Sequence, residues 1–192
     1  KRAVGDRSSA SRAGVTMLDL TGPTQSRAIR DLLQSLFALE ATQPSRSLWL
    51  LSAWLTDAPV IDNWARQFSA IDPEWVVGPV VLSTVLRTTL SRGGSVNVIT
   101  RPDSINEPFI ATMRSLRTQF PLSLGLLVEP DFHDKGLVGD DYELAGSMNF
   151  TRKGIETNSE HLIFRTDAEV VAERRLDLTA RWQTKLDAAS RP

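Results

Sequence analysis

Apolar residues recur at intervals of three and four along much of the chain, and short apolar runs lie between these stretches. The spacing is typical of helices with one buried face, and the runs are typical of buried strands. The pattern predicts helices over residues 24–40, 57–68, 79–91, 106–117 and 168–186, and strands over 47–55, 96–100, 121–128, 133–138, 142–147 and 161–165. Thr24 is the expected N-cap of the first helix, and Pro59 is expected in the first turn of the second.

The order of these elements predicts the fold class. Strands that alternate with helices, followed by a hairpin at Gly139-Asp140-Asp141, indicate an α/β sandwich in which helices flank a central mixed sheet. The second predicted helix places Ile61, Trp64 and Phe68 on a buried face. We expect residues 1–16 to form a flexible tail or arm and residues 17–192 to form a single domain.

The amino-acid composition excludes several classes of function. The 22 Lys and Arg residues nearly balance the 23 Asp and Glu residues, which argues against a protein that coats nucleic acid but leaves a local basic groove open. Without cysteine there is no disulfide, thiolate zinc site or cysteine nucleophile. Since no apolar run approaches the ~18 residues of a membrane span and residues 1–14 lack the apolar core of a secretory signal, we expect a cytoplasmic protein without stable membrane association.

The residues with the most chemical meaning lie on the predicted hairpin. His133 and Lys135 are two positions apart, so in a strand they project to one face while Asp134 points to the other. Ser147 and Asn149 are spaced in the same way on the following segment. If the segments pair, they bring a nucleophile, a cation and neutral donors together, a set suited to a phosphodiester under displacement.

These residues resemble the motif of the phospholipase D superfamily, in which His-x-Lys-x4-Asp is followed by Gly-Ser-x-Asn. His133, Lys135 and Asp140 have the motif's spacing, and residues 146–149 (GSMN) supply the second element. Gly154, Asn158 and Glu160 look like its continuation. The resemblance extends from about residue 25 to the end of the chain and implies a phospholipase D-like α/β sandwich.

The resemblance also implies roles for the matching residues. His133 would attack phosphorus and form a phosphohistidine, while Lys135 and Asn149 would hold the non-bridging oxygens, with Ser147 as an auxiliary donor. Glu160 would accept a hydrogen bond from the far nitrogen of His133. Asp140 and Gly146 would be structural. Neither a metal ion nor another cofactor is expected.

Enzymes of this family need a second histidine as general acid for the leaving alkoxide. The only other histidine is His161, which has no x-Lys partner and, by strand alternation, points away from the face of Glu160. His133 of a second copy would then supply the acid, and a two-fold dimer brings two such identical patches together. The single motif therefore predicts a homodimer with a shared site.

Four further residues are candidates for substrate binding. Trp54 is expected at a strand end that opens toward the site, and Arg101 follows another strand and could reach a second phosphate. Arg152 and Lys153 follow Asn149 and could form a rim for a phosphate backbone. The alternative for these charges is plain solvent exposure. Three other tryptophans are assigned to packing: Trp49, Trp64 and Trp182.

Three functions fit this pattern. A nuclease is favoured, with DNA as the preferred substrate, because small single-motif members of the family are mostly nucleases. Residues 133–161 also resemble phospholipase D-like proteins of bacterial DNA-modification and phage-defence islands. The second function is a phospholipase or transphosphatidylase, and the third is a non-catalytic dimerisation module that binds nucleic acid. The motif alone determines only phosphodiester chemistry.

Overall fold

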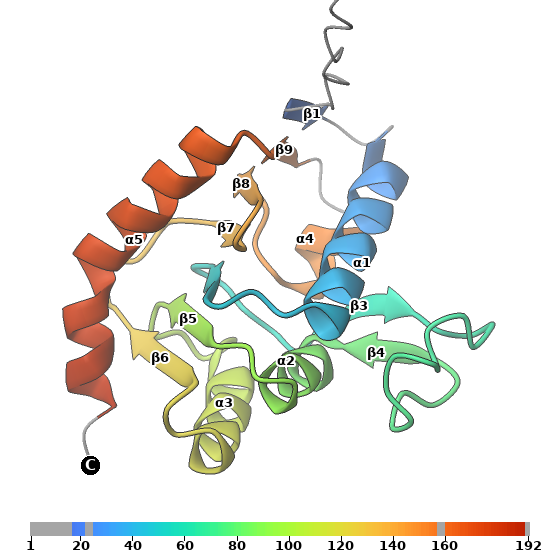
Figure 1. Ribbon diagram of the computed structural model, residues 1–192, viewed down its shortest axis with the longest axis horizontal. Coiled ribbons are helices and arrows are strands. Elements are labelled where there is room, and N and C mark those ends of the chain that lie inside the picture. The colour runs from blue at the N-terminus through green and yellow to red at the C-terminus, as the bar shows by residue number, and fades with distance from the viewer. Residues whose placement is uncertain (1–16, 22–24, 157–159, 191–192) are drawn as a thin grey trace, which may run out of the picture.

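A seven-stranded mixed sheet forms the centre of the computed structural model, which describes residues 17–21, 25–156 and 160–190 (Figure 1). The strand order is β1-β9-β8-β7-β2-β5-β6, in which β2, β5 and β6 are parallel and the other pairs are antiparallel. The strands are β1 (Met17–Thr21), β2 (Leu48–Leu51), β5 (Val96–Thr100), β6 (Leu124–Val128), β7 (Gly136–Val138), β8 (Glu143–Gly146) and β9 (His161–Arg165). A separate two-stranded sheet pairs β3 (Pro59–Asp62) with β4 (Pro79–Val81).

Helices cover both faces of the central sheet, which confirms the predicted sandwich (Figure 1). They are α1 (Ser26–Thr42), α2 (Leu82–Ser91), α3 (Glu107–Gln119), α4 (Arg152–Glu156) and α5 (Ala168–Ala189). Alternate residues of β2 separate the two layers: Leu48 and Leu50 belong to the core shared with α1, α2 and α3, whereas Trp49 and Leu51 pack with residues of α5. All four residues of β2 are buried, as expected for a central strand with both faces covered.

The predicted helix over residues 57–68 is wrong. Residues 59–62 form β3, and the following loop is organised by the buried side chain of Asn63, which donates to the carbonyls of Trp75 and Val76. Trp64, expected in the core, is 67% exposed. The apolar residues do have helical spacing. The backbone hydrogen-bonding groups of this segment are nevertheless satisfied by pairing with β4 and by the bonds of Asn63, and not by a helix.

Two other strand predictions need correction. Strand β7 begins only at Gly136, so His133, Asp134 and Lys135 precede the strand instead of forming part of it. Strand β1 was not predicted, because four of its five residues are exposed and it exists through its pairing with β9. The predicted N-cap Thr24, the tail over residues 1–16, and Asn158 lie outside the described residues.

The hairpin turn between β7 and β8 is stabilised by a buried polar cluster. Asp140 Oδ2 accepts hydrogen bonds from the backbone N–H and the Nε of Arg46, both at 3.0 Å, and its Oδ1 lies 2.8 Å from Arg175 Nη2. Glu40, 1% exposed, accepts hydrogen bonds from the Ser45 and Tyr142 hydroxyls. Burial raises the pKa of Glu40 above its usual value, more than the bonds from Ser45 and Tyr142 lower it. Asp140 therefore holds the turn, away from the site described next.

Candidate active site

Five chain segments meet at one edge of the central sheet. Since β7 is antiparallel to both β2 and β8, the start of β7 lies beside the ends of those two strands. The antiparallel pairing of β8 with β9 brings the start of β9 to the same edge, and the parallel pairing of β2 with β5 adds the end of β5. Candidate residues from positions 52–54, 101–103, 133–135, 147–149 and 160 are thereby collected at this edge.

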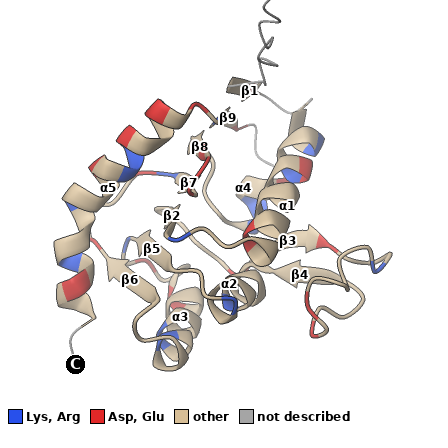
Figure 2. Ribbon diagram, viewed as in Figure 1, with Lys and Arg blue, Asp and Glu red and all other residues tan. Residues whose placement is uncertain are grey.

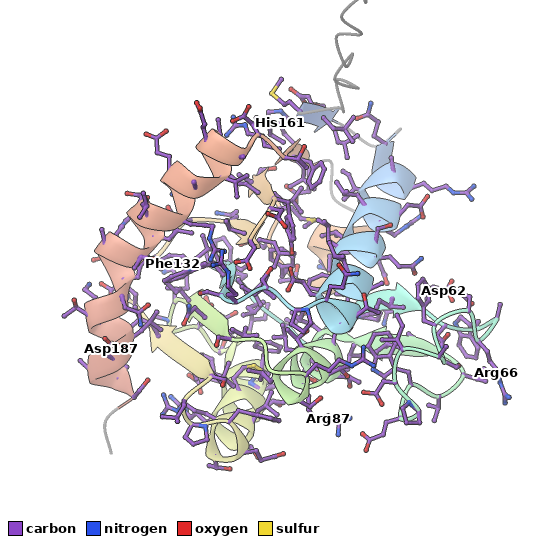
Figure 3. All side chains as sticks on the ribbon, in the orientation of Figure 1. Asp62, Arg66, Arg87, Phe132, His161 and Asp187 are labelled. Atoms are coloured by element: carbon purple, nitrogen blue, oxygen red, sulfur yellow. The ribbon has the colours of Figure 1, made fainter. Side chains whose placement is uncertain are left out.

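The His133–Lys135 segment lies between the sheet edge and α5. Phe132 is buried and packs edge-to-face on Trp182 of α5, with ring centroids 5.7 Å apart (Figure 3). Asp134 turns toward α5, where Arg181 Nη1 lies 3.3 Å and Arg174 Nη2 lies 3.9 Å from its Oδ2.

The side chain of His133 is exposed, and within the described residues it makes no hydrogen bond or ion pair. Lys135 Nζ donates to the carbonyl oxygen of His133 at 2.8 Å, so the lysine lies folded along the same segment. Asp134 is thus held on the side of α5 while the imidazole beside it is left open to an incoming group.

Ser147 and Glu160 are joined at the opposite border of the site. Ser147 Oγ donates to Glu160 Oε2 at 2.5 Å and accepts from the backbone N–H of His161 at 3.0 Å. Glu160 is 9% exposed. Among the contacts of described residues there is none between Glu160 and His133, so its role as the partner of the imidazole stays a prediction. Gly146 permits this approach, because a Cβ there would lie 2.0 Å from the His161 carbonyl oxygen.

Asn149 is oriented by the segment that follows β2 and not by the neighbouring Ser147. Its Oδ1 accepts the backbone N–H of Trp54 at 3.1 Å. A backbone N–H must face the amide oxygen, so this bond fixes which end of the carboxamide points inward. The Nδ2 donors have no partner in the described part of the chain and are available to an anionic oxygen. Ser147 and Asn149 therefore border the site from different sides.

Trp54 and Arg101, both predicted to bind substrate, lie together next to Asn149. Trp54 is 36% exposed, and the guanidinium carbon of Arg101 lies 5.5 Å from its ring centroid. The indole Nε1 donates to Asp103 Oδ2 at 3.1 Å. These contacts attach both side chains to the loop that follows β5.

Arg152 and Lys153 are exposed on α4, directly after Asn149. Arg152 forms an ion pair with Glu156 at 3.0 Å and lines a groove of about 920 Å³ between α1, α4 and the β3–β4 sheet. Charges of both signs line this groove, among them Arg30 and Asp62. Basic and acidic residues also alternate along α5 and α1 (Figure 2). Neither the lining of this groove nor these two helices carry charge of a single sign.

His161 points away from the site. Its Nε2 lies 2.9 Å from Asp19 Oδ1 of the edge strand β1, far from Phe132 (Figure 3). This contact matches the expected opposite orientations of His161 and Glu160.

The sequence reading missed four residues that shape the site. Arg174 and Arg181 lie seven positions apart, hence on one face of α5, and both contact Asp134, but nothing in their spacing pointed to that partner. Asp103 and Asn106 follow β5 and carried no recognisable signal. Their role depends on the neighbouring strand β2, which is distant in sequence.

The comparison with protein families agrees with this geometry. Residues 76–182, more than half of the chain, match the family described as “Cardiolipin synthase, PLD-like domain”. The chain belongs to the phospholipase D superfamily. Members of this superfamily are phosphodiesterases or transferases, and the matched residues include the whole His133–Asn149 motif. The comparison with curated protein sequences finds no match.

Solved structures of other proteins share the fold. Nuc of Salmonella typhimurium, a phospholipase D family member, has 18% sequence identity and a TM-score of 0.56, covering 88% of this chain and 94% of its own. NucT of Helicobacter pylori has 14% identity and a TM-score of 0.54, with 87% and 95% coverage. Phosphatidylserine synthase of Haemophilus influenzae has 14% identity and a TM-score of 0.53, but the match covers 84% of this chain and only 37% of the synthase.

Proposed function

We propose that the protein is a metal-independent phosphodiesterase that cleaves nucleic acid through a site shared by two protomers. The observation that carries the proposal is the position of His133. Its exposed imidazole lies at the sheet edge reached by Lys135, Ser147, Asn149 and Glu160, while Asp134 is turned away to α5. A nucleophile is thus accompanied by a cation, by the Ser147 hydroxyl, which is bonded to Glu160, and by the Asn149 amide donors, which have no acceptor among the described residues.

The chemistry follows from this arrangement. A nitrogen of His133 attacks phosphorus, and the bond from phosphorus to the leaving oxygen breaks, which leaves a phosphohistidine and an alkoxide. His133 of the second protomer donates its proton to that alkoxide. Water then attacks phosphorus, the same second histidine takes its proton, and the phosphorus–nitrogen bond breaks. Lys135 and the Nδ2 of Asn149 stabilise the charge on the non-bridging oxygens.

The family resemblance supports a nucleic-acid substrate. This chain spans nearly the whole of Nuc and NucT but about a third of the phosphatidylserine synthase. The small single-motif members that it resembles are mostly nucleases, so DNA is the favoured substrate. The described part of the chain has no helix long and apolar enough to cross a membrane. The resemblance of residues 133–161 to proteins of DNA-modification and phage-defence islands favours a cytoplasmic defence role.

Two other functions are kept as alternatives. A phospholipase or transphosphatidylase would use the same chemistry on a lipid headgroup. A non-catalytic dimerisation module would bind nucleic acid without cleaving it. TrmBL2, an archaeal chromatin protein with a novel mode of DNA binding, shares the fold at 12% identity and a TM-score of 0.53.

One panel separates the three functions. The purified protein is incubated with labelled single- and double-stranded DNA, RNA and phosphatidylcholine vesicles, each with and without EDTA. We expect cleavage of nucleic acid that EDTA does not reduce, because no group of three or more His, Asp or Glu side chains is placed to hold a metal among the described residues. Turnover that EDTA abolishes and Mg²⁺ restores would contradict the mechanism. Cleavage of the lipid alone would select the second function, and binding without cleavage the third.

A further inference from the structure

Trp54, Arg101 and Asp103 form a connected surface beside the candidate site, here termed the tryptophan platform. The backbone N–H of Trp54 donates to Asn149 Oδ1, so the platform begins at a residue that would hold the reacting phosphate. Arg101 lies over the indole ring, and Asp103 accepts the indole N–H. Any group bound here is therefore next to the group that reacts.

The platform has a rigid support. The side chain of Asn106 is fully buried and donates to the carbonyls of Ala53 at 2.9 Å and Arg101 at 2.8 Å. Its Oδ1 accepts the N–H of Leu55 at 2.7 Å. One side chain thereby joins the end of β2 to the end of β5 and determines how Trp54 and Arg101 lie relative to each other. Such preorganisation is typical of binding groups rather than of loose surface arginines.

The guanidinium of Arg101 has unpaired hydrogen-bond donors. Within the described residues it makes no hydrogen bond or ion pair, and its Nε is buried without a partner. Asp103, the nearest acid on this surface, is otherwise occupied: Oδ1 accepts from the Ile105 N–H and Oδ2 from Trp54. The bonds from Ile105 and Trp54, together with the charge of Arg101, keep the pKa of Asp103 below its usual value. Arg101 thus lies over the Trp54 ring, and its guanidinium donors have no partner among the described residues.

We propose that the tryptophan platform binds the phosphate next to the one that is cleaved, with Arg101 as its ligand and the Trp54 ring in contact with the attached sugar or base. This inference rests on the proposed nuclease function and specifies its substrate. A polynucleotide offers a second phosphate one nucleotide away, whereas phosphatidylcholine has only the reacting one. The platform would therefore select polynucleotides over simple phospholipids at a site whose chemistry serves both.

A matched pair of chromogenic substrates isolates the second phosphate. Thymidine 5′-(p-nitrophenyl phosphate) is compared with the same compound carrying a 3′-phosphate, and thymidine 3′-(p-nitrophenyl phosphate) is compared with its 5′-phosphorylated form. We expect the wild-type protein to prefer the phosphorylated member of one pair by at least about 10-fold in kcat/KM, as a charge-assisted contact predicts. Arg101→Ala should remove that preference. Arg66→Ala, which removes the same charge from the remote β3–β4 loop, should retain it (Figure 3).

The outcomes separate the two levels of the proposal. If the wild-type protein shows no preference in either pair, or if Arg101→Ala keeps the preference, the platform is not a phosphate site although the nuclease function stands. If the wild-type protein hydrolyses phosphatidylcholine vesicles but none of the nucleotides and no oligonucleotide, the nuclease proposal itself falls, and the platform with it. Should Arg101→Ala fail to fold, Arg101→Met keeps an apolar stem against Trp54 and is expected to lose the preference equally.

Discussion

Because their charge and hydrogen-bond geometry differ, the site residues are expected to contribute unequally to turnover. In the proposed mechanism, Lys135 supplies a full positive charge at the reacting phosphate, whereas Asn149 supplies neutral donors. We expect Lys135→Ala to lower kcat on an oligonucleotide by ~10²-fold or more, the usual effect of removing a preorganised donor. Asn149→Ala should be milder, and steady-state kinetics with Arg66→Ala as the control would measure both.

The structure adds a further distinction at Asn149. Because its Oδ1 accepts the N–H of Trp54, Asn149→Asp keeps that bond but replaces the amide donors with negative charge. We therefore expect Asn149→Asp to reduce kcat more than Asn149→Ala does. The reverse order would mean that the link to Trp54, and not the donor, is what the site requires.

Glu160 is predicted to act through charge. Replacement by Gln keeps an oxygen for the Ser147 hydroxyl but removes the negative charge that would favour a protonated His133. We expect Glu160→Gln to lower kcat and to move both limbs of the pH profile of kcat/KM to lower pH, since the charge that favours the protonated imidazole is lost. Glu169→Gln, on the exposed first turn of α5, is the matched control. An unchanged pH profile with reduced stability would show Glu160 to be structural only.

At the level of elements, the β7–β8 hairpin depends on an ionised Asp140. Burial raises the pKa of this carboxyl, but the two hydrogen bonds from Arg46 and the charge of Arg175 together lower it by more. The net shift of the Asp140 pKa is therefore downward. A carboxyl with a lowered folded-state pKa contributes stability above its unfolded value of about 3.9, and that contribution is lost as the pH falls through the folded value.

Asp140→Asn should therefore lower the free energy of unfolding by about 1–2 kcal/mol at pH 7. The difference from wild type should shrink as the pH falls below about 4. Urea unfolding of both proteins at pH 7, 5 and 3.5 measures this difference. If it is the same at all three values, the Asp140 charge is not what holds the turn.

At the level of the whole molecule, the single motif predicts that two chains share one reaction. Pairing wild-type chains with His133→Ala chains leaves each heterodimer with one histidine, which cannot serve as nucleophile and acid at once. Activity should fall with the square of the wild-type fraction when subunits exchange freely, and light scattering should give about twice the 21.2 kDa of one chain. A linear fall in activity, or an active monomer, would contradict the shared site.

The sequence by itself determined the family and the sandwich, and it indicated the candidate reacting residues. Six motif residues, from His133 to Asn149, lie within one short stretch of the chain. Local patterns such as the strand over residues 96–100 are confirmed because the tertiary contacts agree with them. The sequence did not show which distant segments pair as strands. Residues 59–62 became a strand because β4 lies beside them, and β1 exists only against β9.

The same limit applies to the site. Spacing placed His133 and Lys135 together, but it could not show that Arg174 and Arg181 hold Asp134 or that Trp54 orients Asn149, since those partners are 40 to 95 residues away. Only the folded sheet brings the ends of β2 and β5 beside the motif and leaves the donors of Arg101 open. Chemistry that depends on residue type and close spacing can be predicted from the sequence, whereas contacts between distant segments are determined by tertiary packing.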